Sequence, residues 1–188
     1  MVTGAAIAPL LPALAALRIS VFREFPYLYD GDPAYEESYL RTYAAAPGAA
    51  LILAEDAGRI VGASTCLPLA AETANVRAPF EAASYDISRI FYFGESVLAP
   101  DYRGQGIGKA FFAAREAQAA GYGITTFCAV ARPPDHPLRP AAYRPLDRFW
   151  EARGYRQRPS LTCRMSWRDL GQDQESEKTL IFWTKYLT

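Results

Sequence analysis

The sequence predicts a mixed α/β fold in one domain spanning residues 1–188, and three observations support that prediction. Segments with helical periodicity alternate with short apolar runs bounded by turn residues, as in domains whose helices cover a sheet. A glycine-rich turn at 103–109 joins an apolar run that ends at Leu98 to a helical segment that begins at Ile107. The chain has no repeat or linker, and its length allows it to bury roughly 70% of its unfolded surface around a single core.

Two helices are expected first. Apolar positions at helical spacing predict a helix over 9–24, which Pro26 ends because proline cannot continue the hydrogen-bond ladder. Residues 25–31 form a turn-rich aromatic loop, after which Asp32-Pro33 is a typical helix start. The second helix carries three tyrosines on one face, Tyr35, Tyr39 and Tyr43.

The middle of the chain predicts strands. Apolar runs at 51–54 and 60–66 flank Asp56-Ala57-Gly58 and indicate a β-hairpin. Residues 89–98 are expected to form the central strand, and residues 124–131 form another strand after the long helix.

The last part of the chain predicts a short helix at 146–153 and a strand at 161–167. Residues 173–178 read as a charged surface connection. Residues 180–187 are too apolar for a free tail, so they are expected to add a strand or to pack on the core or on a second subunit. A homodimer is therefore one of the alternatives.

Composition excludes several classes of function. Lys plus Arg and Asp plus Glu number 20 each, so no basic field exists to bind nucleic acid or an anionic membrane. The three cysteines are scattered in apolar runs, which predicts buried, reduced thiols in a cytoplasmic protein. A single histidine and the lack of C-x-x-C predict no structural metal. The N-terminal segment lacks a basic start and runs on at helical spacing, so neither a signal peptide nor a membrane span is expected.

The glycine-rich turn is a candidate phosphate-binding loop. Free N–H groups in such a turn and in the first helical turn point the same way, at the positive end of the helix dipole. A Walker A loop needs a longer spacing than the one between Gly104 and Gly108, and a dinucleotide fingerprint needs its last glycine one residue later. A third pattern, R/Q-x-x-G-x-G/A, is met by Arg103, Gly106 and Gly108.

This third pattern resembles the acyl-CoA-binding loop of the GNAT superfamily of N-acyltransferases. Residues 97–108 look like the family's V-x-P-x-x-R-G-x-G-I-G segment, and residues 149–155 resemble its later Y-E-K-x-G-F segment, within a core motif at 89–156. The resemblance implies a mixed, mostly antiparallel sheet of roughly six to seven strands with a splayed parallel pair, flanked by about four helices. Residues 1–7 are a poor strand, so the strand with which the family usually opens is expected to be short or absent.

The resemblance also implies acetyl-CoA as co-substrate. Its pantetheine arm would lie between two splayed strands, one ending near Leu98 and one starting near Ile124, with its diphosphate on residues 103–109. Phe149 and Trp150 would line the acyl arm, or could equally be packing residues. The implied cofactor-binding residues are Val97, Leu98, Arg103, Gly104, Gln105, Gly106, Ile107, Gly108, Lys109, Phe149 and Trp150.

Acyl transfer to an amine needs a base, an oxyanion donor and a proton for the leaving thiolate. The hydrogen-bond donor to the oxyanion could be a backbone N–H of Val97 or Leu98. Glu95, beside the expected thioester, is the first candidate base, although it could equally be the partner of an arginine. His136, in a proline-rich loop, is the second candidate base, because an unperturbed imidazole titrates near neutrality. The alternative for His136 is a solvated loop residue.

The chain departs from the family at the proton donor. Many members have a tyrosine four residues before the glycine of the late segment, where this chain has Trp150, whose indole is not a useful acid. Tyr143, seven residues earlier, is therefore the candidate donor to the thiolate, with water or the substrate as alternatives.

The acceptor is expected between the loop after the first helix and the loops beyond the second splayed strand. Aromatic faces with Asp30 would suit a cationic amine, two arginines would suit a carboxylate, and both together would suit an amino acid. The implied substrate-binding residues are Tyr27, Tyr29, Asp30, Tyr35, Arg132 and Arg139.

These expectations favour an acetyl-CoA-dependent N-acetyltransferase acting on a small, amino-acid-like amine. One alternative is acetylation of a protein N-terminus or lysine. Another is a non-catalytic sensor that binds acyl-CoA.

Overall fold

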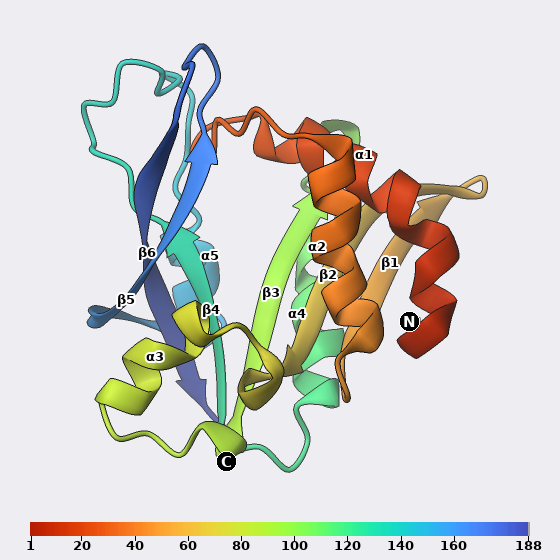
Figure 1. Cartoon of the computed structure of the whole chain (residues 1–188), viewed down its shortest axis with the longest axis vertical. Coiled ribbons are helices and arrows are strands. Elements are labelled where there is room, and N and C mark those ends of the chain that lie inside the picture. Colours follow the sequence, from red (N-terminus) through yellow and green to blue (C-terminus); the bar gives the residue numbers. More distant parts are fainter. Residues whose placement is uncertain (188) are drawn as a thin grey trace.

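The computed structural model describes residues 1–187, apart from the side chain of Thr42, and has one mixed sheet at its centre (Figure 1). The strand order is β1-β2-β3-β4-β6-β5, and among these residues only β3 and β4 pair in parallel. The predicted fold class is therefore confirmed. The strands are β1 Ala50–Asp56, β2 Arg59–Pro68, β3 Ile90–Leu98, β4 Ile124–Val130, β5 Arg156–Arg168 and β6 Glu175–Tyr186.

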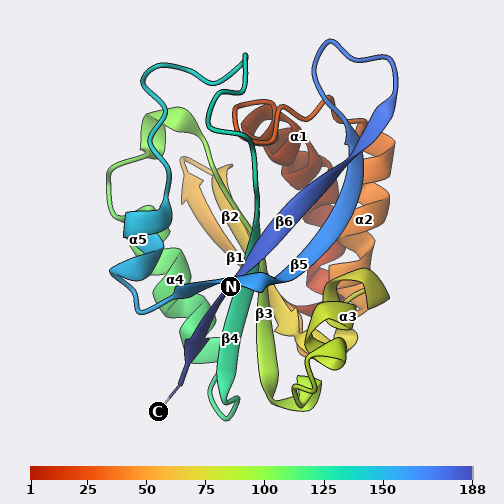
Figure 2. The same cartoon turned by 90° about the vertical axis from the view of Figure 1, so that its left-hand side faces the viewer.

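Helices cover both faces of the sheet, α1, α2 and α3 on one and α4 and α5 on the other, as Figure 2 shows. Their bounds are α1 Leu11–Phe22, α2 Pro33–Ala45, α3 Ala74–Ala82, α4 Ile107–Gln118 and α5 Asp147–Glu151. Short 3-10 segments lie at Gly4–Leu10, Leu69–Ala71, Ile87–Arg89 and Pro100–Tyr102. The cap predicted for the second helix is present, because Asp32 Oδ1 accepts the N–H of Tyr35 at 2.8 Å.

The predicted hairpin is confirmed by the pairing of Asp56 with Arg59. Ala57 and Gly58 between them both have positive φ, 48° and 78°, which matches the right-handed twist of the two strands. At the N-terminus, Val2 forms only an isolated bridge with Leu51 before the 3-10 segment begins, so the opening strand is almost absent, as expected.

The end of the chain corrects one expectation. Residues 173–178 do not form a surface connection throughout, because β6 already begins at Glu175 and pairs with Arg168 of β5. Glu175 and Glu177 are exposed at the outer end of this long hairpin, whereas Lys178 is buried and donates to the Trp167 carbonyl at 2.6 Å. The expectation that 180–187 adds a strand is confirmed, since β6 lies between β4 and β5.

The core lies on both faces of the sheet. One cluster packs α2 and α3 against β3 and β5, a second packs α4 and α5 against β3, β4 and β6, and a third packs α1 against β1–β3. The three cysteines are buried, as predicted. The helical stretch Gly4–Phe22 is long and apolar enough to span a membrane, but it packs Ile7, Leu11 and Leu14 into the third cluster and is an integral part of this fold.

Candidate active site

The parallel strands β3 and β4 separate soon after they meet. They pair at only three positions, from Ile90 with Ile124 to Tyr92 with Thr126, and both strands then continue without pairing to each other. Figure 1 shows the two arrows diverging towards the α1–α2 loop. We call the unpaired stretches, 93–98 of β3 and 127–130 of β4, the splay. The predicted splayed pair is thus present, and its exposed backbone can bind an extended ligand.

A β-bulge in β3 decides where Glu95 points. Ser64 pairs with Ser96 and Cys66 with Phe93, so Gly94 and Glu95 together oppose a single residue, Thr65. The inserted residue changes which side chains face each side of the sheet. Before the bulge Tyr92 faces α2 and α3, and after it Glu95 and Val97 face α1. Without the bulge, Glu95 would lie on the opposite face with α4.

Glycine is required at the bulge. A Cβ on Gly94 would lie 2.3 Å from Tyr43 Oη and 2.4 Å from Thr65 Oγ1. The Glu95 backbone is held on both sides, since its N–H donates to Thr65 Oγ1 at 3.0 Å and its carbonyl accepts from Ser64 Oγ at 3.0 Å. The local geometry of β3 at Glu95 is therefore set by side chains of β2 and α2.

Glu95 belongs to a buried ion cluster. Arg18 of α1 forms ion pairs with both Glu95 and Glu36, and its guanidinium lies between the rings of Phe22 and Tyr39, at 5.1 and 4.7 Å from their centroids. The side chains of the three charged residues are at most 10% exposed. The alternative of an arginine partner for Glu95 is therefore realised. Because one guanidinium serves two carboxylates, the cluster has one negative charge in excess.

The cluster continues to the loop after α1. Tyr29 Oη donates to the second oxygen of Glu36 at 2.7 Å, and burial together with this hydrogen bond raises the pKa of Tyr29 above its ordinary value. Tyr29 thus links the buried cluster to the surface where the acceptor was expected.

Strand alternation selects the N–H that faces the splay. The N–H of Ala99 donates to the Val61 carbonyl at 2.9 Å, and Glu95 also directs its N–H to β2. Val97, lying between them and paired with Ala63, has the same orientation. The N–H of Val97 is therefore not available to an oxyanion in the splay, whereas the N–H of Leu98 faces it.

The glycine-rich turn has free N–H donors. In the described part of the chain, the first N–H of this segment to reach a backbone acceptor in the helix is that of Lys109, which donates to Gly106 at 2.9 Å, so those of residues 104–108 have no backbone acceptor. Gly104 and Gly106 have φ of +77° and +87°, which explains the need for glycine. The first turn of α4 contains no acidic residue and carries Lys109. These features fit a diphosphate group.

Of the two α5 aromatic residues, Phe149 packs beside this turn and Trp150 packs on the sheet. A Cβ on Gly108 would lie 3.4 Å from Phe149, while the Trp150 ring contacts Phe127 and Trp183 at centroid distances of 5.1 Å. Trp150 is thus integrated into the core on the α4 side, which fits the packing alternative. Its role in binding the acyl arm stays a prediction.

His136 and Tyr143 meet at Phe25. The Phe25 ring contacts His136 at 5.7 Å and Tyr143 at 4.6 Å between centroids, so the proline-rich loop rests on the loop after α1. His136 Nδ1 accepts the N–H of Leu138 at 3.2 Å. Burial raises the pKa of Tyr143, so its hydroxyl is protonated at neutral pH but is a weaker acid than that of a solvated tyrosine.

The guanidinium of Arg132 is bound by other groups of the protein. Its guanidinium binds Asp169 through two hydrogen bonds of 2.8 Å and also donates to the carbonyls of Pro26 and Tyr27. Burial disfavours the Asp169 carboxylate, but hydrogen bonds from Arg132 and Lys178 outweigh it and lower its pKa. Arg139 is half-buried and lies over the Tyr143 ring at 5.3 Å. Neither arginine joins Tyr29, Asp30 and Tyr35 at a common cavity.

Those three residues line a cavity of about 340 Å³ between the start of α2 and the β5–β6 hairpin. Asp30 is paired there with Arg168 at 2.8 Å. The remaining charged residues at the cavity are acidic: Asp32, Asp173 and Glu175. Together with the rings of Tyr29, Tyr35 and Trp167, these carboxylates favour a cation.

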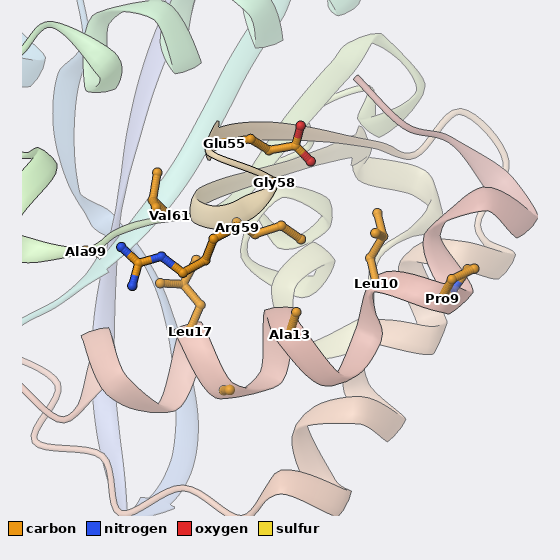
Figure 3. A pocket seen from close by; sticks show the side chains of 11 residues that line it. Pro9, Leu10, Ala13, Leu17, Glu55, Gly58, Arg59, Val61 and Ala99 are labelled. Carbon is orange, nitrogen blue, oxygen red and sulfur yellow. The ribbon is translucent and has the colours of Figure 1, made fainter.

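A larger groove of about 620 Å³ lies elsewhere, between the N-terminal helix and the β1–β2 hairpin (Figure 3). Leu10, Ala13 and Leu17 rise from the helix toward the hairpin, and Glu55 and Arg59 are the charged residues that line it. None of the predicted site residues lines this groove, and it lacks converging polar groups.

Comparison with known proteins identifies the family. The profile described as the Acetyltransferase (GNAT) family matches residues 14–146, more than two thirds of the chain. The chain belongs to the GNAT acetyltransferase family. No curated protein matches it in sequence.

Solved structures agree with this family fold. A ribosomal-protein-alanine N-acetyltransferase from Brucella melitensis is 18% identical, with a TM-score of 0.62 and 96% of each chain covered. A phosphinothricin acetyltransferase from Sinorhizobium meliloti, in complex with acetyl-CoA, is 15% identical, with a TM-score of 0.59 and 97% and 85% of the two chains covered. At such identities the likeness to these GNAT structures is one of fold.

Sequence reasoning missed Arg18 and Glu36. Arg18 is the only charged residue between positions 4 and 22, and a single charge in so apolar a helix was the available signal. Glu36 had no such signal, because it stands in a polar helix start beside Glu37. Its role in this GNAT chain depends on α1 and α2 packing together.

Proposed function

We propose that the protein is an N-acetyltransferase that transfers the acetyl group of acetyl-CoA to the amine of a small molecule, by direct attack on the thioester. The observation that carries this proposal is that the unpaired edge of β3 is followed closely by the glycine-rich turn. The unpaired edge ends at Leu98, and the N–H groups of residues 104–108 in the turn lack backbone acceptors. This arrangement suits an extended arm followed by a diphosphate.

The residues beside the splay would then share the chemistry. The Leu98 N–H would stabilise the oxyanion formed as the amine attacks the carbonyl carbon. The cluster of Arg18, Glu36 and Glu95 has one excess negative charge, so it can attract an ammonium and accept one proton from it through Glu95. As the C–S bond breaks, the thiolate would take a proton from Tyr143 or from water.

The acceptor is proposed to be a cationic amine of the di- or polyamine type. An amino-acid-like acceptor would need a cation for its carboxylate, but Arg132 is bound to Asp169, and the arginine at the cavity, Arg168, is paired with Asp30. The acidic and aromatic cavity beside Tyr29 offers sites for a second ammonium group. A cytoplasmic location would supply both substrates.

Calorimetry with acetyl-CoA, followed by a thiol-release screen over polyamines, aminoglycosides and amino acids, tests the proposal. We expect binding and turnover with a polycationic amine. Glu95→Gln should lower kcat by at least tenfold and leave acetyl-CoA binding unchanged, and Tyr143→Phe should lower kcat more than it raises the KM of the amine. If the protein binds acetyl-CoA but turns over no amine, a protein acceptor or a non-catalytic sensor becomes the better assignment. If it does not bind acetyl-CoA, the proposed function is refuted.

A further inference from the structure

The side chain of Arg103, the first residue of the glycine-rich turn, is already bound to protein groups. Its Nη1 and Nη2 donate to the two carboxylate oxygens of Glu24 at 2.8 and 3.0 Å, and its Nε donates to the Leu98 carbonyl at 3.2 Å. This is the fork geometry in which arginine binds a carboxylate most strongly. Glu24 lies just after the C-terminal end of α1.

The contact covers part of the splay. Strand alternation directs the Leu98 carbonyl, like its N–H, away from β2 and toward the side where β4 has departed. An extended ligand that pairs with the β3 edge needs these same polar groups. The guanidinium of Arg103 therefore stands at the edge that the pantetheine arm would use.

Glu24 and a diphosphate would compete for Arg103 in this geometry, because the carboxylate engages one N–H of each Nη and the Leu98 carbonyl engages Nε, which leaves two of the five N–H donors. A diphosphate carries more negative charge than one carboxylate, and the free N–H groups of 104–108 would hold it beside Arg103. The pair is also partly exposed, with 42% and 45% of the two side chains accessible, so it is weak enough to exchange.

Glu24 is part of the loop that leads to the acceptor cavity. Its carbonyl accepts the N–H groups of Tyr27 and Leu28 at 3.1 and 3.0 Å, which forms the base of the turn after α1. The ion pair with Arg103 thus ties this loop directly to the glycine-rich turn.

We propose that Glu24 is a positioning residue that holds Arg103 over the β3 edge in the free protein and releases it to the diphosphate when acetyl-CoA binds. Binding of the co-substrate then frees the acceptor loop from the glycine-rich turn. The inference rests on the proposed function, since it requires acetyl-CoA as the ligand.

The test is calorimetry of acetyl-CoA binding to the wild-type chain, Glu24→Gln, Arg103→Gln and the double variant. Glu24→Gln removes the competitor for Arg103, so acetyl-CoA should bind about two- to fivefold more tightly, the range expected for an exposed ion pair. Its KM for acetyl-CoA should fall by a similar factor with kcat within about twofold of the wild type. A residue with only a structural role would not tighten binding.

Glu177→Gln is the matched control, because Glu177 also pairs with an exposed arginine, Arg164, but lies on the β5–β6 hairpin. It should leave binding unchanged, and Glu24→Gln should have no effect in the Arg103→Gln background. Unchanged or weaker binding by Glu24→Gln relative to this control, or tightening that persists without Arg103, would overturn the inference alone. Failure of the wild type to bind acetyl-CoA would overturn the proposed function as well.

Discussion

Replacing Arg18 by methionine tests whether the buried cluster is a true ion network. Methionine keeps an apolar stem between the rings of Phe22 and Tyr39 but removes the charge shared by Glu36 and Glu95. Arg18 is only 8% exposed and Glu36 only 1%, so both carboxylates would lose their cation in a site with little water. Breaking a buried pair in this way costs about 3–5 kcal/mol. We expect the free energy of unfolding to fall by that amount.

Urea denaturation followed by tryptophan fluorescence measures this loss. Arg164→Met is the control, since Arg164 and Glu177 keep 68% and 52% of their side chains exposed and should contribute less than about 1 kcal/mol. If Arg18→Met costs no more than this control at pH 7, the reasoning about the buried cluster is wrong.

Three further results are expected. Gly106→Ala places a side chain at φ +87°, which costs about 1–2 kcal/mol of backbone strain. This variant should bind acetyl-CoA at least tenfold more weakly in calorimetry, while its circular dichroism spectrum is unchanged. Normal affinity would show that the turn is not part of the binding site. Gly94→Ala brings a Cβ to 2.3 Å from Tyr43 Oη and should cost about 1–3 kcal/mol in thermal unfolding; an unchanged Tm would show that the bulge is not tightly packed. The lowered pKa of Asp169 stabilises the fold above the unfolded pKa of about 3.9, and this contribution is lost as the pH falls through the lower folded value. Asp169→Asn should therefore destabilise the protein by about 1–3 kcal/mol at pH 7 but much less near pH 3, and an equal loss at both pH values would exclude ionisation as the cause.

The sequence by itself determined the elements whose signals are local. Apolar periodicity located α1, the Asp32-Pro33 start located α2, and the Asp56-Ala57-Gly58 turn located the first hairpin. The pattern of Arg103, Gly106 and Gly108 indicated a phosphate-binding turn, which its resemblance to the GNAT family made an acyl-CoA loop. These features depend on interactions within a few residues, such as helical hydrogen bonds, turn conformations and free N–H groups at a helix start. The short helix α3 falls outside what was predicted, because its nine residues give little periodic signal.

Only the tertiary structure decided the composition of the site. The sequence placed Glu95 near the reaction centre, but its orientation depends on a bulge opposite Thr65, thirty residues earlier, and its partner Arg18 comes from another helix. Arg132 was expected at the acceptor and is engaged by Asp169. Val97 and Leu98 were both candidate oxyanion donors, and strand alternation directs only the Leu98 N–H to the splay. Such contacts join residues far apart in the chain, and strand register and helix packing, which set them, leave no local pattern in the sequence.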